Sequence, residues 1–135
     1  RMGYIFQNYF LMPELTALEN AILPITIAGR DGRERAEFLL HEVGLGHRLE
    51  HLPTELSGGE QQRVAIARAL ATDPDIVFAD EPTGNLDSRN GREVIDHLIQ
   101  LVDQHKKTLV VVTHDDHLAS LGDRRLELKD GKIQS

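Results

Sequence analysis

The stretch that most constrains the fold is residues 56–71, where two glycines open a long helix-forming run. It reads LSGGEQQR and continues with VAIARALA, without further glycine or proline. Such residues favour a helix, for which Ser57 is a good N-cap. The free N–H groups and positive dipole end then face the region before Ser57, and Gly58 and Gly59 let an anion approach the backbone. The run predicts a phosphate-binding helix start rather than an ordinary capped surface helix.

Composition narrows the class of protein. The chain has 135 residues, enough for one domain with one core, and its 15 basic and 22 acidic residues give a net charge of −7. An acidic chain without a basic run is a poor candidate for binding nucleic acid. It has no cysteine, which excludes thiol chemistry and disulfides. No apolar run approaches the about 20 residues of a membrane span.

The order of the expected elements indicates an α/β fold with a largely parallel sheet. Short apolar runs predict strands at residues 3–6, 76–79 and 108–113, and we expect the last two to be buried on both faces. Helical patterns cover 16–21, 33–43, 57–71, 87–104 and 116–121, with Pro24 limiting the first. Thr16 is the expected N-cap of the first helix, and Asp87 or Ser88 that of the helix ending at 104. The buried face expected for the latter comprises Val94, Ile95, Leu98, Leu101 and Val102. Residues 125–134 predict a hairpin with a type I′ turn. The resulting organisation is a helical subdomain at 11–55 between core segments 1–10 and 56–135.

Polar residues follow three of the expected strands. Gln7 follows the first, Asp80 and Glu81 end the second, and His114 follows the third. Ligands of open α/β sheets bind beyond the carboxyl ends of the strands, although each residue alone has an ordinary structural explanation. Asp80 suits Mg²⁺, and Glu81 suits the polarisation of an attacking water in phosphoryl transfer. Gln7 could hold a water or the metal, and His114 could donate to a terminal phosphate.

Five motifs resemble those of the ATP-binding-cassette (ABC) ATPases. Residues 56–61, LSGGEQ, resemble the signature motif, and 76–81 resemble the Walker B strand with its catalytic glutamate. Residues 84–87 resemble the D-loop, 113–115 the switch histidine, and 6–7 the glutamine loop. The motifs have the family's order and spacing over nearly the whole chain. The strings ADEPTGNLD and LSGGEQQRVAIARAL look most like the subfamily of lipoprotein-release, macrolide-export and cell-division ATPases.

The resemblance implies part of a P-loop NTPase core that works as a head-to-tail dimer around ATP and Mg²⁺. Asp80 and Gln7 would bind the metal. Three residues would act in catalysis: Glu81 as general base, His114 as sensor of the γ-phosphate, and Gln7. Asp87 would lie at the nucleotide-containing dimer interface. The residues that would contact the γ-phosphate held by the partner are those of the helix start: Ser57, Gly58, Gly59 and Gln61.

The family also implies a role and a location. Its members power transmembrane permease subunits, from the cytoplasm and peripherally on the inner face of the plasma (inner) membrane, without a nucleic-acid partner. The 135 residues contain no G-x-x-x-x-G-K-[ST] loop, the Walker A loop that cradles phosphates. We therefore expect an N-terminally truncated chain that alone binds ATP weakly or not at all and is inactive.

Three alternatives remain open. An ABC-type ATPase that regulates a membrane or cell-division complex without transport would carry the same motifs. A metal-dependent phosphohydrolase would use the cluster at residues 114–117, HDDH, with His47 and His51 as further ligands. A DNA-repair member of the wider superfamily is disfavoured by the acidic balance and by the short helical insertion.

Overall fold

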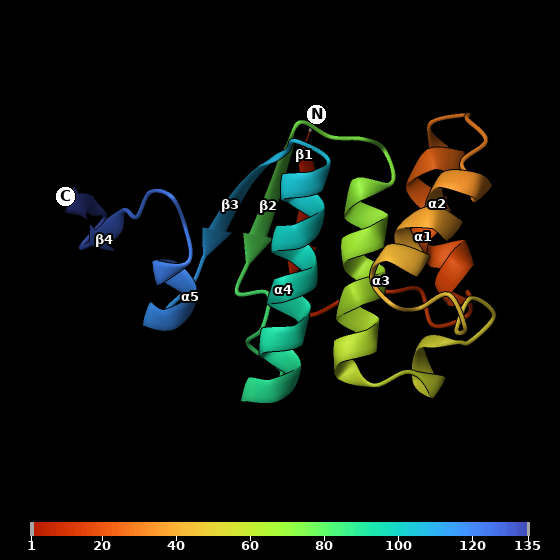
Figure 1. The fold of residues 1–135 in the computed structure, drawn as a ribbon, viewed down its shortest axis with the longest axis horizontal. Coiled ribbons are helices and arrows are strands. Elements are labelled where there is room, and N and C mark those ends of the chain that lie inside the picture. The colour runs from red at the N-terminus through yellow and green to blue at the C-terminus, as the bar shows by residue number, and fades with distance from the viewer. Residues whose placement is uncertain (1, 135) are drawn as a thin grey trace.

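A three-stranded parallel sheet lies at the centre of the computed structural model, which describes residues 2–134 (Figure 1). Its strands β1 (Met2–Phe6), β2 (Ile76–Asp80) and β3 (Thr108–Val112) lie in the order β1-β2-β3. Phe6 pairs with Asp80 and Asp80 with Val112, so the three strands end level. The predicted α/β class with a parallel sheet is confirmed. Arg1 and Ser135, the outer ends of the predicted core segments, lie outside the described residues.

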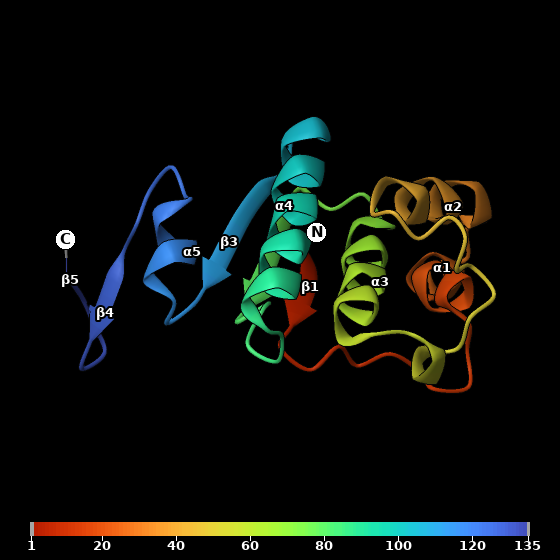
Figure 2. The same ribbon diagram turned by 60° about the horizontal axis from the view of Figure 1, so that its bottom comes forward.

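Helix α3 (Gly58–Leu70) is the central helix. It contacts β1 and α4 (Ser88–Gln104) on one side and α1 (Ala17–Ile27) and α2 (Arg33–Glu42) on the other, as Figures 1 and 2 show. A short 3-10 helix, η1 (Pro53–Glu55), precedes it. Helix α5 (Asp116–Ser120) and the hairpin β4 (Glu127–Lys129) and β5 (Lys132–Gln134) lie beyond β3. Asp130 and Gly131 both have positive φ, which confirms the predicted type I′ turn.

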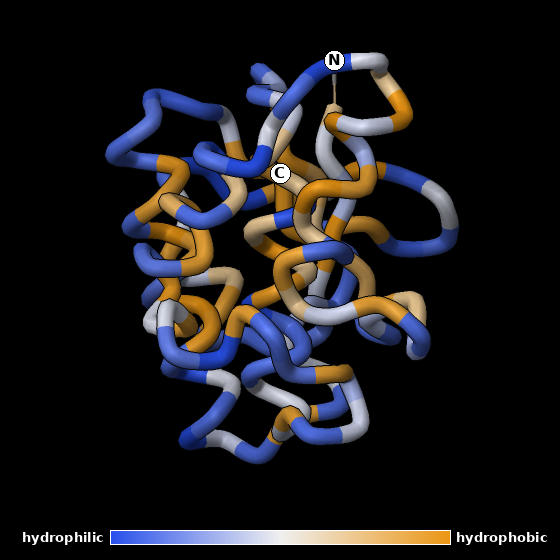
Figure 3. Tube along the Cα trace, turned by 90° about the vertical axis from the view of Figure 1, so that its right-hand side faces the viewer, coloured by the Kyte–Doolittle hydropathy of each residue, from blue (hydrophilic) through white to orange (hydrophobic). Residues whose placement is uncertain are grey.

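The core forms where the helices face one another and the sheet. Hydrophobic stretches of the Cα trace gather toward the middle of the molecule, and hydrophilic ones form much of the outer loops (Figure 3). Helix α4 contributes the apolar stripe predicted from its spacing, which comprises Val94, Ile95, Leu98, Leu101 and Val102. Among residues 2–134, no helix combines the length and the hydropathy needed to cross a bilayer.

One face of the sheet is exposed, so the prediction of strands buried on both faces is wrong. Val77 and Ala79 are fully buried, whereas Tyr4, Val110 and Val112 are 49%, 41% and 46% exposed. Successive side chains of a strand point to opposite faces. Helix α3 packs on β1 and α4 on β3, and the side chains that alternate with the buried ones remain open to solvent.

The first helix does not stop at Pro24, contrary to expectation. It continues to Ile27 with the proline inside, although an internal proline loses one helical hydrogen bond and crowds the preceding turn. Ala21 and Ile25, four residues apart and therefore on one face, are buried on either side of Pro24 and keep both halves packed. The expected N-cap, Thr16, is present.

Candidate functional site

Glu81 is held in place at the end of β2 by the segment that follows β3. The backbone N–H of His114 donates to Glu81 Oε1 at 2.8 Å, and Thr113 Oγ1 lies 3.4 Å from Glu81 Oε2. His114 Nε2 lies 3.7 Å from Oε1, and the imidazole is fully exposed. The level strand ends thus bring together Glu81 and His114, as their positions in the sequence predict. The carboxylate is oriented while a quarter of its side chain stays open to solvent.

The backbone at Glu81 adopts a conformation that non-glycine residues rarely take. Its φ is 46°, in the left-handed region. Hydrogen bonds fix the turn on both sides: Glu81 N–H donates to Val112 O at 2.8 Å, and Gly84 N–H donates to Glu81 O at 3.0 Å. Such strain, of about 1–3 kcal/mol, persists where the surroundings over-determine it, and it clusters at functional sites.

Asp80, the residue before Glu81, is exposed at the strand tip. In the part of the chain that the structure describes, its carboxylate has no hydrogen bond or ion pair, so its oxygens are free to bind. Magnesium binds one or two carboxylates and completes its shell with waters and substrate phosphates, a donor set that suits this position. No three histidine and acidic side chains among residues 2–134 gather into a metal site.

Gln7 lies at the same edge but contacts the loop after Glu81, and no bond of its side chain to Asp80 is found within residues 2–134. Its Nε2 donates to Asn85 Oδ1 at 3.1 Å, and Asn85 Nδ2 donates to the Gln7 carbonyl at 3.0 Å. A Cβ on Gly84 would lie 2.6 Å from Gln7 Cδ, so a side chain at this position would displace the Gln7 side chain. The segments that resemble the glutamine loop and the D-loop are therefore joined, through an Asn85 that sequence reasoning had given no role.

The start of α3 is capped by its own side chains. Glu60 N–H donates to Ser57 Oγ at 3.1 Å, and Ser57 N–H donates to Glu60 Oε1 at 2.9 Å. The bond from Ser57, together with Arg48 3.6 Å away, lowers the pKa of the Glu60 carboxyl. Gln61 folds back, with Nε2 donating to Leu56 O at 3.2 Å. The expectation that all of the first four N–H groups of this helix are free is therefore wrong, because those of Glu60 and Gln61 donate to Ser57.

Two donors remain free at this helix start. Within residues 2–134, the N–H groups of Gly58 and Gly59 have no acceptor, and the Ser57 hydroxyl accepts a bond without donating one. An added Cβ on Gly58 would lie 2.9 Å from the Tyr9 hydroxyl, and one on Gly59 would lie 3.5 Å from Asn90 Oδ1. The free amides thus lie beside the glutamine loop and the start of α4, at the end of the molecule where the strands end (Figure 1).

Asp87 caps α4. Its carboxylate accepts from Asn90 N–H at 2.9 Å and from Asn90 Nδ2 at 3.1 Å, and the backbone bond lowers its pKa. The side chain is exposed beside the start of α3, because Asn90 lies next to Gly59. The residue expected at a subunit interface therefore also orders the helix that follows it.

Two side chains of α3 that the sequence analysis did not single out hold the first loop. Gln62 is fully buried and donates to the carbonyls of Phe6 and Pro82. Arg68 donates to the carbonyls of Tyr9 and Phe10, both at 2.8 Å. The only signal in the sequence was the helical spacing of Gln62 with the buried Ile66, which places it on the inner face.

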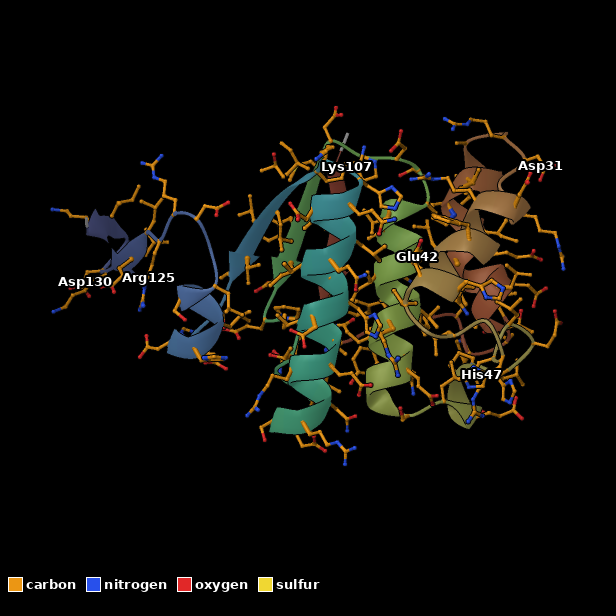
Figure 4. All side chains as sticks on the ribbon, viewed as in Figure 1. Asp31, Glu42, His47, Lys107, Arg125 and Asp130 are labelled. Atoms are coloured by element: carbon orange, nitrogen blue, oxygen red, sulfur yellow. The ribbon has the colours of Figure 1, made fainter. Side chains whose placement is uncertain are left out.

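The ligand set of the alternative phosphohydrolase is dispersed. His47 lies beside the helices α1 and α2, and α5, which contains His117, lies on the other side of the sheet (Figure 4). The arrangement gives that alternative no metal cluster in the described part of the chain.

Comparisons with known proteins agree with these motifs. The model of a family described as ABC transporter matches residues 1–84. The lipoprotein-releasing system ATP-binding proteins LolD of Syntrophus aciditrophicus and Aquifex aeolicus are each 53% identical, over 98% of this chain and 60% of theirs. An uncharacterized ABC transporter ATP-binding protein, YbbA of Escherichia coli K12, is 51% identical with the same coverage.

Among solved structures, the dimeric bacterial ABC transporter cassette MJ0796 matches all of this chain and 61% of its own, with a TM-score of 0.84 and 45% identity. A second structure of that cassette, described as a post-hydrolysis state bound to ADP and Pi, has the same TM-score at 44% identity. The chain therefore has the fold of these cassettes, and it spans about 60% of the length of the curated relatives it matches.

Proposed function

Because the chain belongs to the ABC transporter family, we propose that it serves as the ATP-binding and ATP-hydrolysing subunit of a transporter and powers a membrane permease. The observation that carries the proposal is the oriented carboxylate of Glu81, in contact with the segment that contains His114 and next to Asp80, whose carboxylate has no partner among residues 2–134. Phosphoryl transfer needs positioning and charge neutralisation, which this arrangement suits.

In this proposal each strand end has one role. Asp80 would hold Mg²⁺, whose charge would offset that of the phosphates, and Glu81 would be the general base that takes a proton from the attacking water. His114, exposed beside Glu81, donates to the γ-phosphate. Gln7, held against Asn85, approaches the water or the metal when the site fills.

The second subunit completes the site. We propose a head-to-tail dimer in which Ser57, Gly58, Gly59 and Gln61 face the γ-phosphate bound by the partner. The free amides of Gly58 and Gly59 at a helix start support this orientation, because a helix N-terminus favours an anion. The exposed Asp87 lies beside this start and would relay the state of one site to the other.

The division of the chain follows from these roles. Residues 1–10 would supply a core strand and the glutamine loop, 11–55 a helical subdomain, and 56–135 the signature helix and the rest of the ATPase core. The protein would work on the cytoplasmic face of the inner membrane, against permease subunits. The names of the LolD relatives make a lipoprotein the first transported substrate to test.

The test uses the full-length gene product and its Glu81→Gln variant. We expect turnover of MgATP by the unchanged protein and a loss of about 10²–10⁴-fold in the variant, since a general base contributes on that scale. ATP binding persists, and light scattering detects an ATP-bound dimer. Glu93→Gln, the same change on an exposed residue of α4, serves as control and retains turnover. Unaltered turnover by the Glu81 variant would remove this residue from the role of base.

A further inference from the structure

One buried side chain of α3 contacts both loops that leave the first two strands. Gln62 is fully buried, and its Nε2 lies 3.0 Å from the carbonyl oxygen of Phe6 and also donates to that of Pro82. Phe6 immediately precedes Gln7, and Pro82 immediately follows Glu81. A single carboxamide therefore holds the backbone next to two of the proposed catalytic residues.

The chemistry of the site requires a side chain with two donor hydrogens on one atom. Both partners are carbonyl oxygens, which only accept, and the amide nitrogen of glutamine offers two hydrogens. The nitrogen must face them, and Oε1 is left buried without a partner within residues 2–134. Buried polar groups without hydrogen bonds are uncommon. In this orientation Oε1 stays without a hydrogen bond, and both carbonyl oxygens receive one from Nε2.

We propose that Gln62 is a positioning residue, which sets the geometry of Gln7 and Glu81 by fixing the carbonyls of Phe6 and Pro82 to helix α3. The inference rests on the proposed function. The carbonyl of Pro82 lies one residue after the strained backbone of Glu81, so its bond to Gln62 helps hold that turn.

The same residue connects two sites of the proposed dimer. Gln62 lies four residues, about one helical turn, after Gly58, whose free amide would face the partner's nucleotide. A displacement of the start of α3 therefore reaches the loops of Gln7 and Glu81 through one rigid turn. When the start of α3 contacts the nucleotide bound by the partner subunit, Gln62 would transmit the movement to Gln7 and Glu81 of its own chain.

The test is Gln62→Met in the full-length gene product, which keeps the length of the side chain and removes both donors. Its matched control is Asn20→Leu, because Asn20 is the other fully buried polar residue identified in the described chain. Asn20 Nδ2 likewise donates to backbone carbonyls, those of Met12, Leu15 and Thr16, each at 3.1 Å. We measure kcat and KM for MgATP per folded molecule, with the thermal midpoint of each protein.

Both variants should lower the thermal midpoint, and only Gln62→Met should lower kcat, by about tenfold or more, because small misplacements of catalytic groups are costly. We expect its KM to stay within about twofold. Gln62→Glu gives a second readout that does not depend on the methionine variant folding. A buried carboxyl can donate only when protonated, and then through a single O–H to one of the two carbonyls, so its kcat relative to the unchanged protein should rise partway as the pH is lowered from about 8 to about 6.

A wild-type kcat in Gln62→Met, an equal loss of kcat in Asn20→Leu, or a relative kcat of Gln62→Glu that does not change with pH would overturn the inference. These results would leave the proposed function intact, provided that the unchanged protein hydrolyses ATP and Glu81→Gln does not. Absence of turnover in the unchanged protein would overturn the proposed function, and this inference with it.

Discussion

Helices α1 and α3 begin with the same local motif and differ in what lies in front of it. In both, a hydroxyl residue accepts from the third helical N–H, and a glutamate returns the bond: Thr16 with Glu19, and Ser57 with Glu60. The two N–H groups that the capping box leaves over are used in α1. Ala17 N–H donates to His51 O at 2.8 Å and Leu18 N–H to Leu49 O at 3.0 Å.

At the start of α3 the corresponding positions are Gly58 and Gly59, and within residues 2–134 their N–H groups have no acceptor. The first N–H groups of a helix that find no acceptor in the chain are left to water or to a ligand, so these two donors are available to the proposed phosphate. The comparison teaches that a capping box alone says nothing about binding. What distinguishes a binding end from a structural one is whether the chain supplies acceptors for the remaining donors.

The largest expected effect comes from the same substitution at the two N-caps. Ser57→Arg and Thr16→Arg each lose a cap, which costs about 1 kcal/mol of stability. In the full-length gene product, Ser57→Arg should also block closure of the dimer over ATP and reduce turnover by about a hundredfold or more, because a bulky side chain fills the space in front of the free amides. Thr16→Arg should retain turnover per folded molecule.

ATP turnover and ATP-driven dimerisation, each normalised to the folded fraction, check this pair. Normal ATP-driven dimerisation of the Ser57 variant would count against a nucleotide at the start of α3. Equal losses in both variants would mean that the two helix starts differ less than their hydrogen bonds indicate.

Much of the fold could be predicted because it depends on local pattern. The strands, the cap at Thr16 and the buried stripe of α4 follow from apolar spacing and from side chains that reach only a few residues, and the same reasoning narrowed the cap of α4 to Asp87 or Ser88, of which Asp87 is the cap. The exposed face of the sheet could not be predicted, since a run such as residues 109–112 has apolar side chains on both faces and does not tell which face is covered. Packing on both sides of Pro24 likewise overrides the local preference of proline.

The candidate site also has a part that the sequence predicts and a part that it does not. The placement of Glu81 and His114 at one edge follows from the rule that parallel strands end together. The roles of Gln62 and Asn85 could not be read from the sequence. Gln62 donates to backbone carbonyls, with Phe6 56 residues away, and Asn85 bonds both the side chain and the backbone carbonyl of Gln7, 78 residues away. Backbone acceptors carry no residue-type signal that a sequence pattern could expose.

A smaller effect is expected from Gly59→Ala, which separates stability from binding. An added Cβ would meet Asn90 Oδ1 at 3.5 Å, an ordinary contact, and replacing glycine by alanine in a helix stabilises it by about 0.5–1 kcal/mol. The same methyl group lies beside the free amides and should weaken the approach of a phosphate. We expect a higher thermal midpoint together with about a tenfold lower rate of ATP turnover.

The matched control is Gly91→Ala in α4, where the added Cβ would lie 3.3 Å from Thr83 Cβ and has no atom of α3 among its three nearest neighbours. It changes the same residue type in a helix and should leave turnover per folded molecule unchanged. If Gly59→Ala were more stable and fully active, close approach of an anion to this backbone would be disproved.

The smallest effect concerns charge at the two capping boxes. The bond from Ser57 N–H and the nearby Arg48 lower the pKa of Glu60, so the folded state keeps this carboxylate ionised to a lower pH than the unfolded chain does. Its contribution is therefore complete above the ordinary glutamate pKa of about 4.3 and is lost as the pH falls through the lower folded value. Glu60→Gln, which cannot ionise, should make the acid side of the stability curve shallower.

Glu19→Gln makes the same change in the box of α1, where no ion pair of Glu19 is found in the described chain. At neutral pH the Glu60 variant should be less stable than the Glu19 variant by a few tenths of a kcal/mol, the size of an exposed ion pair. The difference, followed by urea unfolding, should shrink both below pH of about 4 and at about 1 M salt, which screens the attraction of Arg48. If the difference in stability between the two variants did not change with pH or salt, it would come from hydrogen-bond geometry rather than charge. The two helix starts would then differ only in their free amides.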